Sequence, residues 1–154
     1  FINIVHPMNA YLVDGDHPEE TIEFLTKEIS KEPIDVALIG IGENGHIAFN
    51  DPGVAEFNDK KVVKPVKLDE VCRQQQVNDG CFADISLVPT HAMTLTVPTL
   101  VKAPNLFCIV PAKTKANAVK ETINGPINED CPATILRKQP CATLYLDPDS
   151  SSLL

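Results

Sequence analysis

The segment "LIGIGENGHIAFNDPG", residues 38–53, decides how the rest of the sequence is interpreted. It continues a short apolar run, "IDVALIGIG", of the kind typical of a strand buried on both faces of a parallel sheet. Glycines then permit tight turns and a close approach of the backbone to a ligand. These glycines are Gly40, Gly42 and Gly45, and they precede His46, Asn50 and Asp51. The segment therefore predicts a functional loop at the carboxyl edge of a sheet, where open α/β sheets bind their ligands.

Helical and strand patterns alternate along the whole chain. Strands are predicted within residues 34–42, 62–67, 105–112 and 141–147 and in the first half of residues 91–103. Helices are predicted within 14–33, 68–80 and 114–125, and a short helix or turn within 133–140. In the first helix Asp16 is the expected cap, Pro18 suits the first turn, and Ile22, Leu25 and Ile29 form the expected buried stripe. The alternation favours a single α/β domain over residues 1–154, with its sheet covered by helices on both faces.

Bulk composition restricts the class of partner. The 154 residues suit one domain with its own core, and the formal net charge is -8, from 13 basic and 21 acidic residues. That balance argues against binding to nucleic acid or to an anionic membrane, although a small anionic substrate remains compatible with it. The sequence has no apolar run near the roughly 20 residues that span a bilayer and no signal-peptide pattern at its start. We therefore expect a cytoplasmic protein.

The cysteines and histidines argue against a metal centre. Five cysteines without any Cys-x-x-Cys pair are expected to be reduced and structural, with Cys108 buried in a strand. His6, His17 and His91 do not lie in a glycine-rich loop such as the one around His46, and they are assigned surface or structural roles. His46 has one nearby carboxylate and no further cluster, so no metal is expected.

His46 is instead the expected proton carrier, because a neutral imidazole titrates near physiological pH. Asp51 is the candidate that orients its ring, and Asn44 can hydrogen-bond to it without adding charge. The spacing Gly-x-Gly-x-x-Gly is present at residues 40–45, but no amphipathic helix follows it. A dinucleotide cofactor is therefore not predicted.

Residues 40–52, "GIGENGHIAFNDP", resemble the signature of the glucosamine-6-phosphate deaminase (isomerase) family. The similarity extends more loosely through "HAMTLTVPTL" and "VPAKTKANAVKETINGP". It implies a Rossmann-like, mostly parallel sheet. It also implies conversion of glucosamine 6-phosphate to fructose 6-phosphate and ammonia by acid–base proton transfer, without a cofactor or catalytic metal. The implied partner is a small amino-sugar phosphate, and the resemblance allows a homo-oligomer.

The resemblance also implies roles for individual residues. His46 matches the histidine that helps open the sugar ring by moving a proton at the ring oxygen. Asp51 matches an acidic position, commonly Glu, in the acid–base relay, and Asn44 matches a position that is often Asp and supports the histidine. The amide at Asn44 removes a charge that would stabilise the protonated histidine. This difference indicates altered tuning of the histidine, a related substrate such as the galactosamine epimer, or impaired activity.

Substrate binding is assigned to Gly42, Gly45 and Lys115. Lys115 matches the family's phosphate-binding lysine and precedes a predicted helix, whose first N–H groups favour an anion, whereas Lys113 and Lys115 could also form a solvated helix start. Arg73 is the nearest candidate for the family's phosphate-binding arginine. The family's early phosphate loop and its aspartate base are not found before Gly40. We therefore expect the chain to be the carboxyl-terminal part of a larger sugar-phosphate isomerase domain.

Two other functions compete with the deaminase. The same superfamily fold supports sugar-phosphate lactone hydrolysis with a Gly-x-His loop, although the "AFNDP" continuation favours the deaminase. The other is a non-catalytic sugar-phosphate-binding relative, which Asn44 and the missing upstream base suggest.

Overall fold

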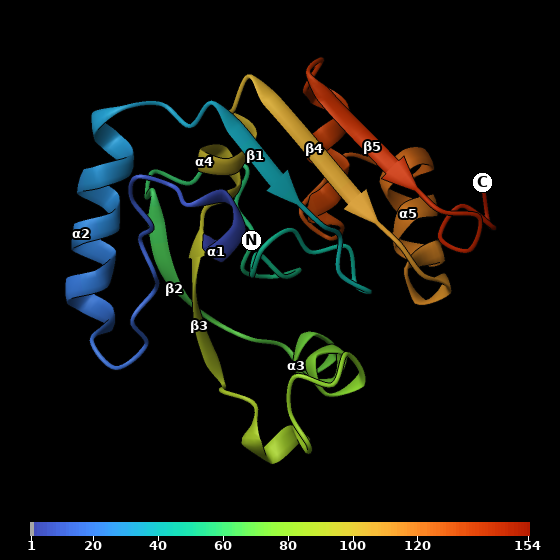
Figure 1. The fold of residues 1–154 in the computed structure, drawn as a ribbon. Helices are drawn as coiled ribbons and strands as arrows, with labels where there is room; N and C mark the ends of the chain where they lie inside the picture. Colours follow the sequence, from blue (N-terminus) through green and yellow to red (C-terminus); the bar gives the residue numbers. More distant parts are fainter. Residues whose placement is uncertain (1) are drawn as a thin grey trace.

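A parallel sheet of three strands forms the centre of the computed structural model, which describes residues 2–154 (Figure 1). Strand β4 (Asn105–Val110) lies between β1 (Val36–Ile39) and β5 (Ala142–Leu146) and pairs in parallel with both. In register, Val36 lies opposite Asn105, and Leu106 opposite Ala142. The predicted α/β class and its mostly parallel sheet are confirmed.

Helices pack on one face of this sheet. Helices α4 (Val97–Val101) and α5 (Ala116–Asn124) and the 3-10 helix η3 (Pro132–Lys138) contribute to the main core together with the inward side chains of the strands. Because side chains alternate across a strand, the other face carries the opposite set. On that face Val36, Leu38, Ile109 and Tyr145 are exposed. Among the described residues, the strand of the "IDVALIGIG" run is thus buried on one face rather than on two.

A second, smaller sheet is separate from the first and lies on its β1 side, next to α2 (Figure 1). Strands β2 (Val63–Lys67) and β3 (His91–Leu95) pair antiparallel, and helix α3 (Glu70–Asn78) and the 3-10 helix η1 (Ile85–Leu87) lie on the connection between them (Figure 1). Both strands are edges, which accommodates Pro65. The Asp69 side chain caps α3 by accepting a hydrogen bond from Cys72 N at 2.6 Å.

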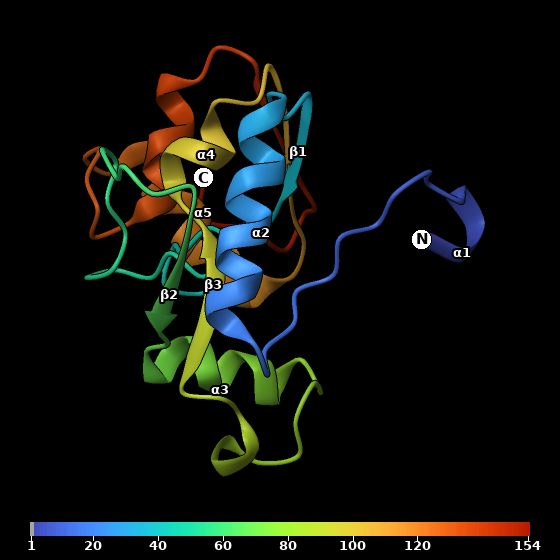
Figure 2. The same cartoon turned by 90° about the vertical axis from the view of Figure 1, so that its left-hand side faces the viewer.

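The first long helix begins with a different N-cap residue from the one that the sequence predicts. Helix α2 (Pro18–Lys31) follows the short α1 (Ile2–Val5), and Figure 2 shows α1 and the chain after it apart from the main body. His17, not Asp16, is the N-cap of α2, and it makes no capping hydrogen bond. Asp14 instead binds this turn, by accepting from Asp16 N and His17 Nδ1, each at 2.9 Å.

No helix in residues 2–154 has the length and apolar character needed to cross a bilayer.

Candidate active site

The loop of residues 40–53 leaves the carboxyl end of β1 and passes between the parallel sheet and α3 (Figure 1). A tight turn forms its first part, in which Gly42 N donates to His46 O at 2.9 Å and Gly45 N donates to Gly42 O at 3.0 Å. Gly45 has φ +84°, and a Cβ at this position would lie 2.5 Å from Cys131 Sγ. A side chain at position 45 would therefore be both strained and obstructed.

Gly42 provides the surface on which the His46 ring lies. A Cβ at Gly42 would be 2.1 Å from His46 Cε1 and 2.3 Å from each ring nitrogen. The imidazole therefore packs directly on the Gly42 backbone, and only glycine leaves room for it. The structure thus gives Gly42 and Gly45 packing reasons, while their contact with substrate stays a prediction.

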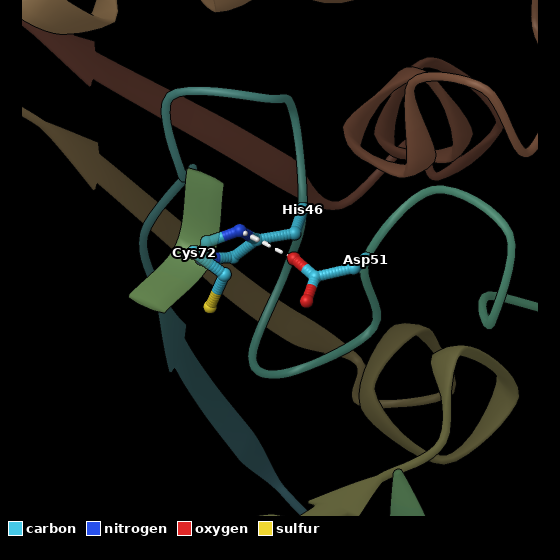
Figure 3. A group of neighbouring side chains, drawn as sticks. All are labelled: His46, Asp51 and Cys72. Atoms are coloured by element: carbon cyan, nitrogen blue, oxygen red, sulfur yellow. Dashed lines mark ion pairs between the residues drawn. The ribbon is translucent and has the colours of Figure 1, made fainter. Parts of the chain in front are cut away.

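The three predicted catalytic residues meet at the Nδ1 atom of His46. This nitrogen lies 2.7 Å from Asn44 Oδ1 and 2.9 Å from Asp51 Oδ1, and Figure 3 shows the ring and the Asp51 carboxylate pointing toward each other. Since both neighbours are acceptors, Nδ1 carries a proton, and Nε2 is the nitrogen of the neutral ring that can accept one. The His46 side chain is 11% exposed and that of Asp51 is 0% exposed, so the ring is open to solvent and the carboxylate is not.

Hydrogen bonds keep Asp51 ionised despite its burial. Its Oδ1 also accepts from Asn44 Nδ2 at 3.1 Å, and its Oδ2 accepts from Asp69 N at 3.4 Å. Burial alone would raise the pKa of Asp51, but the hydrogen bonds from His46 and Asn44 outweigh it and hold that pKa below its usual 3.8. An ionised carboxylate next to His46 stabilises the imidazolium that forms when the ring takes up a proton.

Helix α3 adds two residues to the site that the sequence did not identify as functional, Asp69 and Cys72. Asp69 Oδ2 accepts from Asn44 Nδ2 at 2.8 Å, and Asn44, His46, Asp51 and Asp69 are together called the His46 cluster below. Cys72 lies beside them (Figure 3). The only signal in the sequence was the helix predicted within residues 68–80. It places a carboxylate and Cys72 on the first turn of α3, but it does not say where that turn docks.

The group of His46, Asp51 and Cys72 has ligand types that bind metals such as zinc, and their ligand atoms lie within 4.8 Å of one another. However, a cysteine ligates as the thiolate, and the pKa of Cys72 is raised to about 12 by its burial and by the charges of Asp51 and Asp69. In addition, His46 Nδ1 and Asp51 Oδ1 are already engaged with each other and with Asn44. We therefore interpret the group as a proton-transfer cluster with a neutral thiol beside it.

Lys115 ends the 3-10 helix η2 (Lys113–Lys115), directly before α5. Its Nζ is buried and has no hydrogen-bond partner among the described residues, whereas Lys113 is exposed. Burial lowers the pKa of Lys115, and the negative charges of Glu43 and Asp79 only partly oppose this effect. Glu43, one of the two carboxylates that act on the Lys115 ammonium, belongs to the Gly42–His46 turn.

Arg73 does not join the His46 cluster. Its Nη2 donates to the carbonyl oxygens of Ile85 at 2.6 Å and Val88 at 3.0 Å, and so holds the η1 turn.

Strained backbone occurs in the loop of residues 40–53, at Ala48 with φ 51°, and directly before η2, at Ala112 with φ 82°. Non-glycine residues in such conformations are enriched at functional sites.

Known proteins resemble this chain over nearly all of its length. Residues 3–145 match the family model described as glucosamine-6-phosphate isomerases/6-phosphogluconolactonase. A glucosamine-6-phosphate deaminase from Listeria monocytogenes is 35% identical over 147 residues, which are 94% of this chain and 61% of the relative. A glucosamine-6-phosphate deaminase from Oenococcus oeni is 38% identical over 148 residues, 95% of this chain and 61% of the relative. The chain thus spans about three-fifths of the length of these relatives.

Solved structures agree with the sequence comparison. A monomeric glucosamine-6-phosphate deaminase superposes with a TM-score of 0.82 at 32% identity, over 92% of this chain and 57% of that protein. The 6-phosphogluconolactonase of Trypanosoma brucei has a TM-score of 0.68 at 19% identity, over 92% of this chain and 56% of the lactonase. The second likeness supports the shared fold alone.

Proposed function

The chain belongs to the glucosamine-6-phosphate isomerase/6-phosphogluconolactonase family, and on that premise we propose that the protein is an amino-sugar 6-phosphate deaminase. It converts glucosamine 6-phosphate and water to fructose 6-phosphate and ammonia. The observation that carries the proposal is the His46 ring, whose Nδ1 is held between Asn44 and Asp51 so that Nε2 is left for the substrate. The relatives named deaminases, at 35–38% identity, support the same reaction.

His46 opens the sugar ring in this proposal. Its Nε2 takes the proton of the hydroxyl on the first carbon while the bond from that carbon to the ring oxygen breaks. The ring oxygen then receives the proton from the imidazolium, so that atoms and charge balance and the ring ends in its starting state. Asp51 stabilises the imidazolium during this transfer, because its lowered pKa keeps it ionised. We assign no residue of this chain to the later transfer of a proton from the second carbon to the first.

Lys115 binds the substrate phosphate in this proposal. A buried ammonium without a partner among the described residues is a costly group, and a phosphate dianion supplies both charge and acceptors for it. The backbone of Gly42 and Gly45 completes the substrate-facing side of the turn. No metal or redox cofactor takes part in the proposed reaction, so that turnover is expected to continue in the presence of EDTA.

One assay separates this function from its competitors. The complete gene product is incubated with glucosamine 6-phosphate, galactosamine 6-phosphate and 6-phosphogluconolactone, and ammonia, ketose phosphate and acid release are followed. We expect ammonia and fructose 6-phosphate from the glucosamine substrate. Lactone hydrolysis without ammonia release would replace the proposal with a lactonase, and sugar-phosphate binding without turnover would indicate the non-catalytic relative that Asn44 suggests. Preference for the galactosamine substrate would change the epimer but not the mechanism.

Location and assembly complete the proposal. We assign the protein to the cytoplasm, because a phosphorylated sugar carries charge that prevents its free passage through a bilayer. The structurally similar deaminase is described as monomeric, which favours a monomer over the homo-oligomer that the family otherwise allows. Measurement of the solution mass by light scattering distinguishes the two states.

A further inference from the structure

We propose that Asp69 is a positioning residue, whose carboxylate fixes the amide of Asn44 in the orientation that holds His46. It also supplies, one residue further from the ring, the negative charge that Asn44 does not carry. The geometric part of this inference stands on the contacts alone, and its kinetic part rests on the proposed deaminase function.

The contacts of Asn44 determine which way its amide points. Its Nδ2 donates to Asp69 Oδ2 at 2.8 Å and to Asp51 Oδ1 at 3.1 Å. Its Oδ1 accepts from the backbone N of His46 at 3.1 Å and from the ring Nδ1 at 2.7 Å. A flipped amide would place its oxygen against two carboxylates and its NH₂ group against two N–H donors. The two carboxylates therefore permit a single orientation, and of the two Asp69 is the closer to Nδ2.

Asp69 is itself fixed, so that it can act as an anchor. Its Oδ1 accepts from Cys72 N at 2.6 Å and caps α3, and its backbone N donates to Asp51 Oδ2 at 3.4 Å. The Asp69 carboxylate thus joins two parts of the structure: its Oδ1 binds the start of α3, and its Oδ2 binds Asn44. The first turn of α3 and the His46 loop consequently move as one unit, and the position of the ring depends on the docking of α3.

The arrangement predicts that the residues at positions 44 and 69 depend on each other. Asn44→Asp would put a carboxylate oxygen at the place of Nδ2, within 2.8 Å of Asp69 Oδ2 and 3.1 Å of Asp51 Oδ1. Three carboxylates in hydrogen-bond contact repel one another strongly in a half-buried site. Adding Asp69→Asn removes one charge and returns an NH₂ donor to the contact, so the double variant N44D/D69N exchanges the two groups.

The experiment compares the parent with D69N, N44D and N44D/D69N in the complete gene product. Asparagine is as good an N-cap as aspartate, so D69N keeps the cap of α3 while it removes the charge. The matched control is Asp84→Asn, because Asp84 caps η1 in the same way, through Ser86 N at 2.8 Å, and has no contact with the His46 cluster. Each protein is measured for kcat and KM of ammonia release, for thermal unfolding, and for the titration midpoint of the His46 ring by NMR.

The titratable groups around His46 are Asp51 from its own loop, Cys72 from α3, and Asp69, which contacts Asn44 and Asp51; the charge of Lys115 acts on Cys72. Loss of the Asp69 charge should lower the midpoint in D69N, and D84N should leave it unchanged. We expect kcat of D69N to fall by about tenfold with little change in KM, since misplacement of a catalytic group acts on the chemical step. The kcat of N44D should fall by about ten- to a hundredfold, and N44D should unfold at a lower temperature than the parent. The double variant should regain most of the lost kcat and most of the lost thermal stability.

Two results would overturn the inference. One is a D69N protein whose kcat and His46 midpoint equal those of the parent and of D84N. The other is a double variant that is no more stable than N44D. If no variant and no parent releases ammonia, the deaminase proposal fails, while the NMR midpoints and the unfolding temperatures still decide the role of Asp69.

Discussion

The His46 cluster is buried or half-buried and the Lys115 Nζ atom is buried, but the two satisfy their polar atoms in opposite ways. Asn44, His46, Asp51 and Asp69 hydrogen-bond to one another within 3.4 Å. Lys115 Nζ, by contrast, has no hydrogen-bond partner in the part of the chain that the structure describes. The pKa of Asp51 is lowered, which favours its charge, and the pKa of Lys115 is also lowered, which disfavours its charge. The cluster thus satisfies its polar atoms internally, whereas the Lys115 ammonium lacks the acceptor that the proposed binding of a phosphate would supply.

The largest expected effect concerns the proton carrier of the cluster. His46→Gln should lower kcat of ammonia release by about two to four orders of magnitude, the usual contribution of a general acid–base group. KM should change little, because the glutamine leaves Lys115 in place. The control is His91→Gln, at an exposed position on β3. Near-parental turnover of His46→Gln would show that another group moves the proton.

Gly42→Ala tests whether the cluster is sensitive to a single methyl group. The added Cβ would lie 2.1 Å from His46 Cε1, so the ring must move away from the Gly42 backbone. A displacement of about 1 Å at a catalytic group costs on the order of a hundredfold in rate. Gly15→Ala is the control, since a Cβ there meets no atom within 4 Å. If kcat of Gly42→Ala stayed within a factor of two of the parent, the ring would not be held as the structure shows.

Much of this cluster could be predicted from the sequence, because local patterns specify it. The apolar run before Gly40 predicted the strand, and the Gly-rich turn placed His46, Asn44 and Asp51 on one loop. The helix that follows Asp69 was predicted within residues 68–80, because the start and the end of a helix have recognisable residue patterns. Short-range rules of this kind also gave the helix that begins after Lys115.

The remainder depends on how distant segments pack. Asn44 and Asp69 are 25 residues apart, and only the docking of α3 against the loop brings their side chains to 2.8 Å. The exposure of Val36 and Leu38 was missed because a continuous apolar run has no period that distinguishes one buried face from two. Helix α4 was missed within residues 91–103, since its residues Val97–Val101 are mostly typical of strands, although Pro98 suits a first helical turn.

Lys115→Ala should affect binding rather than chemistry, and so separate the two parts of the site. A charge-assisted contact to an anion is worth roughly 1.5–3 kcal/mol, so KM should rise by on the order of ten- to a hundredfold. The penalty should shrink sharply for an analogue without the 6-phosphate. Lys113→Ala, at the exposed neighbour, is the matched control. An equal penalty on both substrates would make Lys115 a general electrostatic residue.

The smallest effects are on stability, and here the two parts should differ in sign. A lowered pKa makes the Asp51 carboxylate stabilising above its ordinary 3.8, and that contribution is lost as the pH falls through the folded value. For Lys115 the unfolded chain binds more protons between the lowered pKa and 10.5, so the contribution of Lys115 to the free energy of unfolding rises as the pH increases through that window.

At pH 7, Asp51→Asn should therefore lower the free energy of unfolding by about 1–3 kcal/mol. Lys115→Met should raise it by roughly 0.5–2 kcal/mol, because it removes a buried charge that has no hydrogen-bond partner among the described residues. Urea unfolding of the parent and both variants from pH 3 to pH 10 measures these slopes. A Lys115→Met protein less stable than its parent at pH 7 would mean that the ammonium already has a favourable partner, and the contrast between the two parts of the site would be lost.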